Sequence, residues 1–317
     1  MLSLVIPVYR NEGSIPDLLA TLEELSRGEG EAFEVVFVVD GSPDRSLDLL
    51  REMLPRAGFP SKVLCLSRNF GSFAAVRAGL AAGSGDIFAV MAADLQEPPE
   101  LVLSFREALE TGQYDVAVGC RDSRSDPLRD RLFSSTFWGL YRALIQREVP
   151  RGGVDVFGCT RSFRDEILAL NESNSTLVGL IFWLGFRRLE IRYRRRPRLH
   201  GRSAWSFRRK FRYLLDSCFA FSDLPIRLLS LVGLTGIVLS VGFGAVVLLG
   251  RVTGRIEVPG YAATVLTVMF FGGLNSLGIG ILGEYLWRTF ENTKRRPGYV
   301  VISQAEFSGQ PAGHHPN

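Results

Sequence analysis

Polar residues follow four apolar runs in the first third of the chain, and they are of types that bind ligands. The runs at residues 4–8, 33–39, 62–66 and 87–91 are followed by YRNE, DGSPD, SRNFG and AADLQEPP. Carboxylates and amides accept hydrogen bonds from a base or a ribose, and an aromatic ring such as that of Tyr9 stacks on a base. Each stretch alone also fits an ordinary turn with a helix cap. Their repetition at four successive run ends favours a nucleotide-binding edge.

These runs and the segments between them predict an α/β fold. A fifth run lies at residues 115–118, and helix start signals such as SIPD, SPD and PPE stand between the runs. The alternation is typical of a mostly parallel sheet with helices on both faces, which binds its ligands at the carboxyl ends of the strands. None of the runs is followed by GxGxxG or GxxxxGK[ST], which argues against the usual dinucleotide and P-loop sites.

Charge is concentrated in one segment of the chain. The whole sequence has 37 Lys and Arg against 33 Asp and Glu, a net charge of +4. Twelve of the basic residues lie between positions 187 and 212, together with the single acid Glu190, so this segment carries +11 and the rest of the chain −7. Such a basic belt requires an anionic partner, which is nucleic acid, lipid headgroups or a phosphorylated substrate.

Two long uncharged runs predict a transmembrane hairpin. Residues 228–250 and 258–283 contain no charged side chain, and both runs exceed the roughly 20 residues that a helix needs to cross a hydrocarbon core of about 30 Å. A buried hairpin of a soluble protein is the alternative. Basic residues flank both outer ends, which predicts that these ends are cytoplasmic; they are Arg208, Arg209, Lys210, Arg212 and Arg227 before the hairpin and Arg288, Lys294, Arg295 and Arg296 after it.

The segment before the hairpin predicts an interfacial amphipathic helix. Its cations interleave with apolar side chains, a pattern typical of helices at a membrane surface. The apolar side chains are Trp205, Phe207, Phe211, Tyr213, Leu214 and Phe219. A helix that packs on the sheet is the alternative. Because the arginine-rich run adjoins a membrane helix, we expect no nucleic-acid partner. Met1 leads directly into a strand-like run, so we expect no signal peptide and a cytosolic first domain.

Composition and cysteine spacing exclude several other classes of protein. With 46% hydrophobic and 22% charged residues the chain is of a globular type, which excludes a disordered or collagen-like protein. Its four cysteines are far apart and form no CxxC pair, which argues against a disulfide framework or a zinc site and favours a reducing compartment. The polar residues 303–317 are predicted to be disordered.

The motifs together resemble one enzyme family. VIPVYRNE, DGSPD, LSRNFG, ADLQEPPEL and RPRLHGRSAW, followed by two apolar runs, are similar to the polyisoprenyl-phosphate glycosyltransferases. These belong to the family 2 inverting glycosyltransferases and include dolichol-phosphate mannose synthases and bacterial undecaprenyl-phosphate glycosyltransferases. The resemblance covers nearly the whole chain. It implies a GT-A fold and transfer of a sugar from a nucleotide-diphosphate sugar to a polyprenyl phosphate, at the cytosolic face of the inner or plasma membrane of a bacterium.

The resemblance also assigns roles on the donor side. Asp94 and Gln96 would hold a divalent cation, Mg²⁺ or Mn²⁺, on the diphosphate, and Asp155 stands at the position of the catalytic aspartate. A phosphate monoester, whose second pKa is about 6, is already an anionic nucleophile at neutral pH. Asp155 would then orient the reactants rather than act as a strong base, or be structural. The nucleoside pocket would be lined by Pro7, Tyr9, Glu12, Asp40, Ser42 and Asn69.

Acceptor-side roles fall mainly on the basic belt. Arg198, Arg202 and Ser203 would contact the acceptor phosphate. Further phosphate contacts are predicted for Arg121 and, in the following helix, for Arg131 and Ser134, with ordinary surface charge as the alternative. The other arginines of the belt are expected to be solvated or to face anionic lipid headgroups.

Three positions depart from the family pattern. Val39 stands where many relatives have an aspartate just before the one at Asp40, and Ala204 stands where a lysine often follows the serine of the acceptor loop, although Arg202 is near enough to replace it. The metal motif, commonly Asp-x-Asp, reads Ala92-Ala93-Asp94 here. One carboxylate therefore remains where two would share the charge of the cation.

The predicted organisation has four parts. Residues 1–200 form a cytosolic GT-A catalytic domain, 201–226 the acceptor loop and interfacial helix, 227–287 the transmembrane hairpin and 288–317 a cytosolic C-terminal tail. Two other functions stay open. A processive polysaccharide synthase would bring a Gln-x-x-Arg-Trp motif and more membrane helices, neither of which is present. A membrane scaffold that binds nucleotide sugars without catalysis is suggested by Ala92 and Val39. The sequence is compatible with a homo-oligomer.

Overall fold

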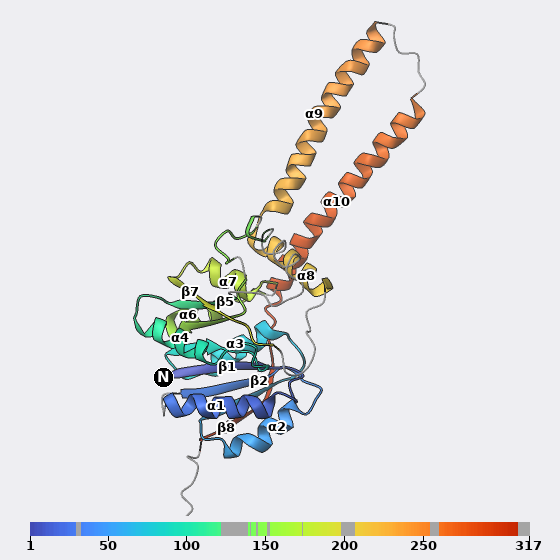
Figure 1. The fold of residues 1–317 in the computed structure, drawn as a ribbon. Coiled ribbons are helices and arrows are strands. Elements are labelled where there is room, and N and C mark those ends of the chain that lie inside the picture. The colour runs from blue at the N-terminus through green and yellow to red at the C-terminus, as the bar shows by residue number, and fades with distance from the viewer. Residues whose placement is uncertain are drawn as a thin grey trace, which may run out of the picture.

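An eight-stranded mixed sheet forms the centre of the N-terminal domain (Figure 1). The computed structural model describes residues 1–29, 33–121, 139, 141–143, 145–150, 153–172, 174–197, 207–253 and 260–309. The strand order is β7-β5-β6-β4-β1-β2-β3-β8. The strands are β1 (Leu2–Val8), β2 (Phe33–Val39), β3 (Ser61–Leu66), β4 (Ile87–Val90), β5 (Val116–Arg121), β6 (Val156–Thr160), β7 (Arg188–Tyr193) and β8 (Val301–Phe307).

The five strand-like runs predicted from the sequence are β1 to β5. Strands β4, β1, β2 and β3 are adjacent and parallel, as the alternation of runs and helices predicts. Strand β7 pairs in parallel with β5, while β6 is antiparallel to both β4 and β5. All of β2 is buried and so is β1 except for one half-buried residue, because helices cover both faces of the sheet.

Helices cover the two faces of the sheet and form two cores. Leu4 and Ile6 of β1 pack on one face with helices α1 (Ile15–Glu29), α2 (Ser46–Met53) and α4 (Glu100–Glu110). Val5 points the other way, toward α3 (Ser72–Ala82), α6 (Arg161–Ala169) and α7 (Leu177–Trp183). A 3-10 turn, η2 (Leu54–Arg56), follows α2. The alternation along β1 is the period of two that a strand imposes on its side chains.

The C-terminal segment returns to the sheet, so the prediction that residues 303–317 are disordered is wrong for residues 303–309. Strand β8 pairs antiparallel with β3 along its edge, and the N–H of Ser67 donates to the carbonyl of Val300 at 2.9 Å. The half-buried residues of β8 alternate as Ser303, Ala305 and Phe307, while the residues between them are exposed. An edge strand needs only backbone pairing and one half-buried face. The polar composition of β8 therefore gave no strand signal in the sequence.

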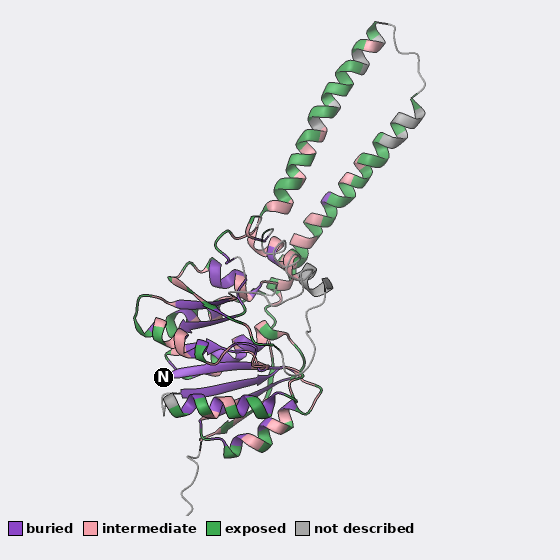
Figure 2. Cartoon of the chain, in the orientation of Figure 1, coloured by how far each residue is buried: buried purple, intermediate pink, exposed green. Residues whose placement is uncertain are grey.

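Two long helices extend from the domain as a hairpin (Figure 1). They are α9 (Leu224–Val252) and α10 (Tyr261–Thr293), and within them Leu224–Val246 and Thr267–Thr293 have mean hydropathies of 2.1 and 1.2. Both segments are long and apolar enough to cross a membrane. Many of their large apolar residues are exposed, and Figure 2 colours most of the hairpin as exposed. Neither apolar window is buried within the described chain, which does not fit the alternative of a buried hairpin in a soluble protein.

Helix α8 (Phe207–Phe221) joins this hairpin to the N-terminal domain. Its side chains Tyr213, Leu214 and Phe221 pack against the core that contains α7. Arg288 of α10 donates to a carboxylate oxygen of Asp216 on α8 at 2.8 Å, and its side chain is 12% exposed. The described end of α8 thus packs on the domain, and the side chains of residues 205–212, part of the predicted membrane-facing pattern, lie outside the described residues.

Candidate active site

The first two loops at the carboxyl edge of the sheet are bonded to each other. The backbone N–H of Arg10 donates to Ser42 Oγ at 2.8 Å, and the N–H of Glu12 donates to Asp44 Oδ2 at 3.1 Å. In return Glu12 Oε2 accepts from the N–H of Arg45 at 3.1 Å. Two of the residues predicted to bind the nucleoside, Glu12 and Ser42, therefore fix the shape of the loops that form this edge.

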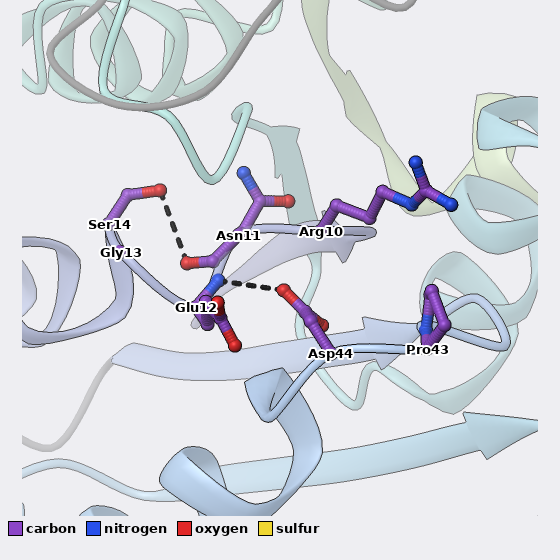
Figure 3. A pocket seen from close by; sticks show the side chains of 7 residues that line it. All are labelled: Arg10, Asn11, Glu12, Gly13, Ser14, Pro43 and Asp44. Atoms are coloured by element: carbon purple, nitrogen blue, oxygen red, sulfur yellow. Dashed lines mark hydrogen bonds between the residues drawn. The ribbon is translucent and has the colours of Figure 1, made fainter.

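Asp44 is the acceptor at the centre of that contact. Burial alone would raise its pKa, but hydrogen bonds from Ser42, Ser46 and the backbone N–H of Glu12 outweigh burial and hold the pKa below its usual value. A cavity of about 450 Å³ opens beside the contact (Figure 3), and it is lined by Arg10, Asn11, Glu12, Gly13, Ser14, Pro43 and Asp44. Of the residues predicted to bind the nucleoside, its lining includes Glu12.

Asp40 joins the second loop to the third. Its side chain is 3% exposed, and its two carboxylate oxygens accept from the backbone N–H groups of Phe70 and Gly71 at 2.7 and 2.8 Å. The Asn69 amide donates to the Asp40 carbonyl at 3.4 Å. Gly41 has a φ of +57°, and a Cβ there would lie 2.3 Å from the backbone of Arg68, so this close approach requires glycine. The structure thus brings Asp40, Ser42 and Asn69 together.

Tyr9 and Pro7 lie at the end of β1 beside this group. Both are half-buried, and the N–H of Tyr9 donates to the Asn11 side chain at 2.9 Å. The guanidinium of Arg10 lies 5.4 Å from the centre of the Tyr9 ring, and Arg10 has a φ of 58°, which is uncommon for a residue with a Cβ. A base that stacks on Tyr9 would therefore meet the guanidinium of Arg10.

The loop after β4 is bonded to the segment after β7. The N–H of Gln96 donates to Asp94 Oδ1 at 3.3 Å, so the two residues predicted to hold the cation lie close together. Gln96 Oε1 accepts from the guanidinium of Arg195, and the Gln96 carbonyl accepts from the N–H of Arg196 at 2.8 Å. The basic belt thus reaches the predicted cation site through Arg195, whereas the sequence placed that part of the belt in solvent or near lipid.

Glu97 is a buried carboxyl beside this loop. Its residue is 3% exposed, the backbone N–H of Ala92 bonds to the carboxyl, and Glu97 Oε2 has no hydrogen-bond partner. Burial, followed by the charges of Asp94 and Asp155, raises the pKa of Glu97 to about 7. Within the described ranges, no group of three His, Cys, Asp or Glu side chains is arranged to hold a metal ion.

Asp155 forms an ion pair on the other side of the site. Arg121 Nη2 donates to Asp155 Oδ1 at 2.7 Å, Arg121 Nε donates to Asp155 Oδ2, and the Tyr193 hydroxyl donates to Oδ2 at 2.8 Å. The three groups meet because Arg121 and Tyr193 are paired at the ends of parallel β5 and β7, while Asp155 immediately precedes antiparallel β6. Both members of the ion pair are partly buried, with 18% and 24% of their side chains exposed.

The contacts with Asp155 change the pKa values of Arg121 and Tyr193. Burial opposes the charge of Arg121, but the carboxylate of Asp155 outweighs it and raises the pKa of the guanidinium. Burial, followed by the charge of Asp155, raises the pKa of the Tyr193 hydroxyl far above its usual range, so Tyr193 is a hydrogen-bond donor at neutral pH. Asp155 therefore has two donors in place, which suits a carboxylate that orients other groups.

Three residues of the site were not predicted from the sequence. Glu97 lies within the ADLQEPPEL motif, but no role was predicted for this residue from the sequence. Tyr193 and Arg195 follow a strand whose apolar alternation, Leu189, Ile191 and Tyr193, is obscured by arginines. Five predicted residues lie outside the part of the chain that the structure describes: Arg131, Ser134, Arg198, Arg202 and Ser203.

Comparison with known proteins identifies the family. The sequence model of the family described as "Glycosyl transferase family 2" matches residues 3–170, more than half of the chain. The chain belongs to glycosyl transferase family 2. Family 2 membership and the observed sheet confirm the predicted α/β GT-A fold class and establish that the protein is a glycosyltransferase.

Curated members of family 2 resemble the chain over nearly its full length. The undecaprenyl-phosphate 4-deoxy-4-formamido-L-arabinose transferase of Pseudomonas paraeruginosa is 35% identical over 95% of this chain and 89% of its own. The prophage bactoprenol glucosyl transferase homolog of Escherichia coli is 29% identical over 95% of this chain and 98% of its own. The resemblance stated from the sequence motifs, to polyprenyl-phosphate members of family 2, is thereby confirmed.

Solved structures resemble the domain more distantly. Glucosyl-3-phosphoglycerate synthase of Mycobacterium tuberculosis, solved in complex with Mn²⁺, UDP and glucosyl-3-phosphoglycerate, is 18% identical and covers 63% of this chain and 73% of its own, with a TM-score of 0.46. TarS of S. aureus, solved with UDP-GlcNAc, is 19% identical and covers 70% of this chain and 67% of its own, with a TM-score of 0.45.

Proposed function

We propose that this family 2 enzyme transfers a sugar from a nucleotide-diphosphate sugar to a polyprenyl phosphate, and so makes a lipid-linked monosaccharide. The observation that carries the proposal is the connection of a family 2 domain to an apolar hairpin through both α8 and β8. The full-length resemblance to a transferase named for undecaprenyl phosphate supports the same acceptor class. An acceptor with a long apolar chain and a phosphate headgroup would reach this domain at a membrane surface.

The proposed topology has two crossings and a cytosolic catalytic domain. Strand β8 follows α10 in the chain and pairs with β3, so the end of α10 and the sheet must lie on one side of any membrane that the hairpin crosses. The basic residues at both outer ends of the hairpin favour the cytoplasm as that side. The belt would also attract anionic headgroups, at about 1 kcal/mol for each Lys or Arg near the surface.

On the donor side, the bonded loops after β1, β2 and β3 would hold the nucleoside. Tyr9 would stack on the base, and the buried carboxylate of Asp40 would keep Asn69 and the third loop in place beside it. Pro7, Glu12 and Ser42 complete this proposed set. Because Glu12 and Ser42 already bond to the neighbouring loop, they would act mainly by keeping the pocket in shape.

On the diphosphate side, Asp94 and Gln96 would hold a divalent cation. The donor set fits Mg²⁺ or Mn²⁺, since these are hard cations that prefer oxygen ligands, and a buried carboxylate oxygen without a partner lies in the same loop. When bound, such a cation neutralises charge on the departing nucleoside diphosphate. Arg195, which bonds to Gln96, would place a guanidinium next to the same phosphates.

Asp155 would position groups for the attack. The acceptor phosphate is already an anion at neutral pH, so the attack needs no strong base. With Arg121 and Tyr193 bonded to it, Asp155 would hold the Arg121 guanidinium at the sugar and phosphate groups. Arg131 and Ser134, and the acceptor-loop residues Arg198, Arg202 and Ser203, would supply the other phosphate contacts.

A panel assay on membranes tests the proposal. Membranes that contain the protein are incubated with radiolabelled nucleotide sugars and with undecaprenyl or dolichyl phosphate. We expect one donor to give a labelled, solvent-extractable lipid, which would identify the sugar, the nucleotide and the prenyl class together. Donor binding without labelled lipid would instead favour a scaffold that binds nucleotide sugars, and a labelled polymer would favour a processive synthase.

A further inference from the structure

The buried carboxyl of Glu97 forms a hydrogen bond with the backbone N–H of Ala92, which involves only one of its two oxygens. Glu97 precedes α4, whose N-cap is Pro99 and has no side-chain cap bond, so Glu97 does not cap that helix. The residue is 3% exposed, and its Oε2 has no hydrogen-bond partner among the described residues. Burying a polar atom without a hydrogen-bond partner destabilises the folded chain, and more so when the group is charged. An unpartnered buried oxygen of this kind indicates that a ligand, such as an ion, binds there.

The place of this carboxyl indicates the ligand. It bonds to the backbone N–H of Ala92, and it lies close enough to Asp94 and Asp155 to feel their charges. Gln96, the residue before Glu97, donates its backbone N–H to Asp94 Oδ1 at 3.3 Å. Two carboxyls and one amide are thus gathered in four residues at the end of β4, where position 92 supplies no side-chain oxygen.

We propose that Glu97 supplies a second carboxylate to the divalent cation that accompanies the donor diphosphate. This inference rests on the proposed function, because it assumes that a nucleoside diphosphate binds at this edge. Mg²⁺ and Mn²⁺ take oxygen ligands and commonly use one or two protein carboxylates together with phosphate oxygens. Asp94, Gln96, Glu97 and the diphosphate would provide such a set, and Glu97 would replace the carboxylate that Ala92 lacks.

The same arrangement explains why the cation would bind with the donor. The guanidinium of Arg195 bonds to Gln96 Oε1, which is one of the proposed ligand atoms. A diphosphate that entered the site would accept from Arg195 and so release Gln96 for the cation. We therefore expect weak binding of Mn²⁺ to the protein alone and stronger binding in the presence of a nucleoside diphosphate.

The test measures nucleotide affinity rather than sugar transfer. The full chain in detergent is titrated with UDP and with GDP by calorimetry, in EDTA and in Mn²⁺, and the nucleotide that binds more tightly is kept. In the wild type we expect Mn²⁺ to increase its affinity. Glu97→Gln should reduce that increase by about tenfold or more, the range in which lost metal-site partners weaken binding, and should leave the affinity in EDTA unchanged.

Matched variants separate a ligand from a structural residue. Glu100→Gln removes a carboxylate three residues away that is 72% exposed, and we expect it to behave as the wild type does. Ala92→Asp in the Glu97→Gln background should restore the Mn²⁺ effect, because it returns a carboxylate to the same end of β4. Glu97→Asp keeps the charge with a shorter reach, and it should fold and lose part of the Mn²⁺ effect.

Two results would overturn the inference. One is an undiminished Mn²⁺ effect in Glu97→Gln or, if that variant does not fold, in Glu97→Asp. The other is the lack of any Mn²⁺ effect in the wild type with both nucleotides. Because no measurement uses an acceptor, a failure to find a lipid product would count against the proposed function and leave the role of Glu97 standing.

Discussion

The ion pair between Arg121 and Asp155 makes a quantitative prediction. If the two side chains act as one unit, then Asp155→Asn, Arg121→Gln and the double variant should have strongly non-additive effects on transfer. Asp155→Asn removes the negative charge and one of the two acceptor oxygens, and Arg121→Gln removes the guanidinium that donates to both. The double variant removes the pair altogether and should be little worse than either single variant.

The expected coupling follows from the geometry. Hydrogen bonds to charged groups contribute roughly 1.5–3 kcal/mol each, and the pair has two of them. Since about a fifth of each side chain is exposed, with 18% for Arg121 and 24% for Asp155, solvent screening reduces this gain. We expect a coupling energy of about 2 kcal/mol. The specificity constant kcat/KM of the double variant should then be about thirtyfold higher than the value expected if the two single effects were additive.

A second Arg–Asp pair, next to the same two strands, provides the control. The Arg187 guanidinium donates two bonds to Asp115 at 2.9 and 2.8 Å, and the two residues immediately precede β7 and β5, at the ends of these strands that are opposite to the site. Asp115→Asn and Arg187→Gln therefore change the same residue types away from the site. We measure kcat/KM for all variants in lipid nanodiscs and their melting temperatures by fluorimetry. Additive losses in the Arg121 and Asp155 series, or equal losses of transfer in the control series, would refute the reasoning.

Three further predictions concern the cation, the topology and the core. Asp94→Ala should abolish transfer, and EDTA should do the same to the wild type; full activity in either case would mean that arginines alone stabilise the leaving group. Reporter fusions after Gly298 should report a cytoplasmic location, and fusions within residues 252–257 should report the opposite side of the membrane. If both fusions report the same side, the hairpin is excluded. Burial would raise the pKa of Glu34, but hydrogen bonds from Ser3 and Ser84 and the charge of Lys62 lower it below 4.5. Its stabilisation is therefore present at neutral pH and is lost as the pH falls below about 4.5, so Glu34→Gln should destabilise the domain by about 2 kcal/mol at pH 7 and flatten the acid limb of its pH–stability curve; an equally steep acid limb would contradict this.

Much of the fold was predictable because the central strands are buried on both faces. Continuous apolar sequences mark β1 and β2 without reference to any contact. Strands β7 and β8 gave no such signal, because arginines interrupt the first and polar residues the second. Their places depend on pairing with β5 and β3, which are distant in sequence.

The site was predictable to the extent that it follows strand ends. Asp40 and Asp94 stand directly after or near apolar runs, so the rule for ligands of parallel sheets finds them. The partners of Asp155 could not be found in that way, because Tyr193 reaches it only through the parallel pairing of β5 and β7. Glu97 was visible in its motif, but the absence of a partner at its buried oxygen is a property of the folded chain.

The most direct test of the proposed function is a stoichiometric assay with the purified protein. The full chain is reconstituted in nanodiscs with and without polyprenyl phosphate, and it is supplied with the donor that the panel assay identifies. We predict that one nucleoside diphosphate is released for each lipid-linked sugar formed, and that release nearly stops when polyprenyl phosphate is left out. Release at the same rate without the lipid, or binding of donor with no release in its presence, would contradict the assignment of this enzyme as a polyprenyl-phosphate glycosyltransferase.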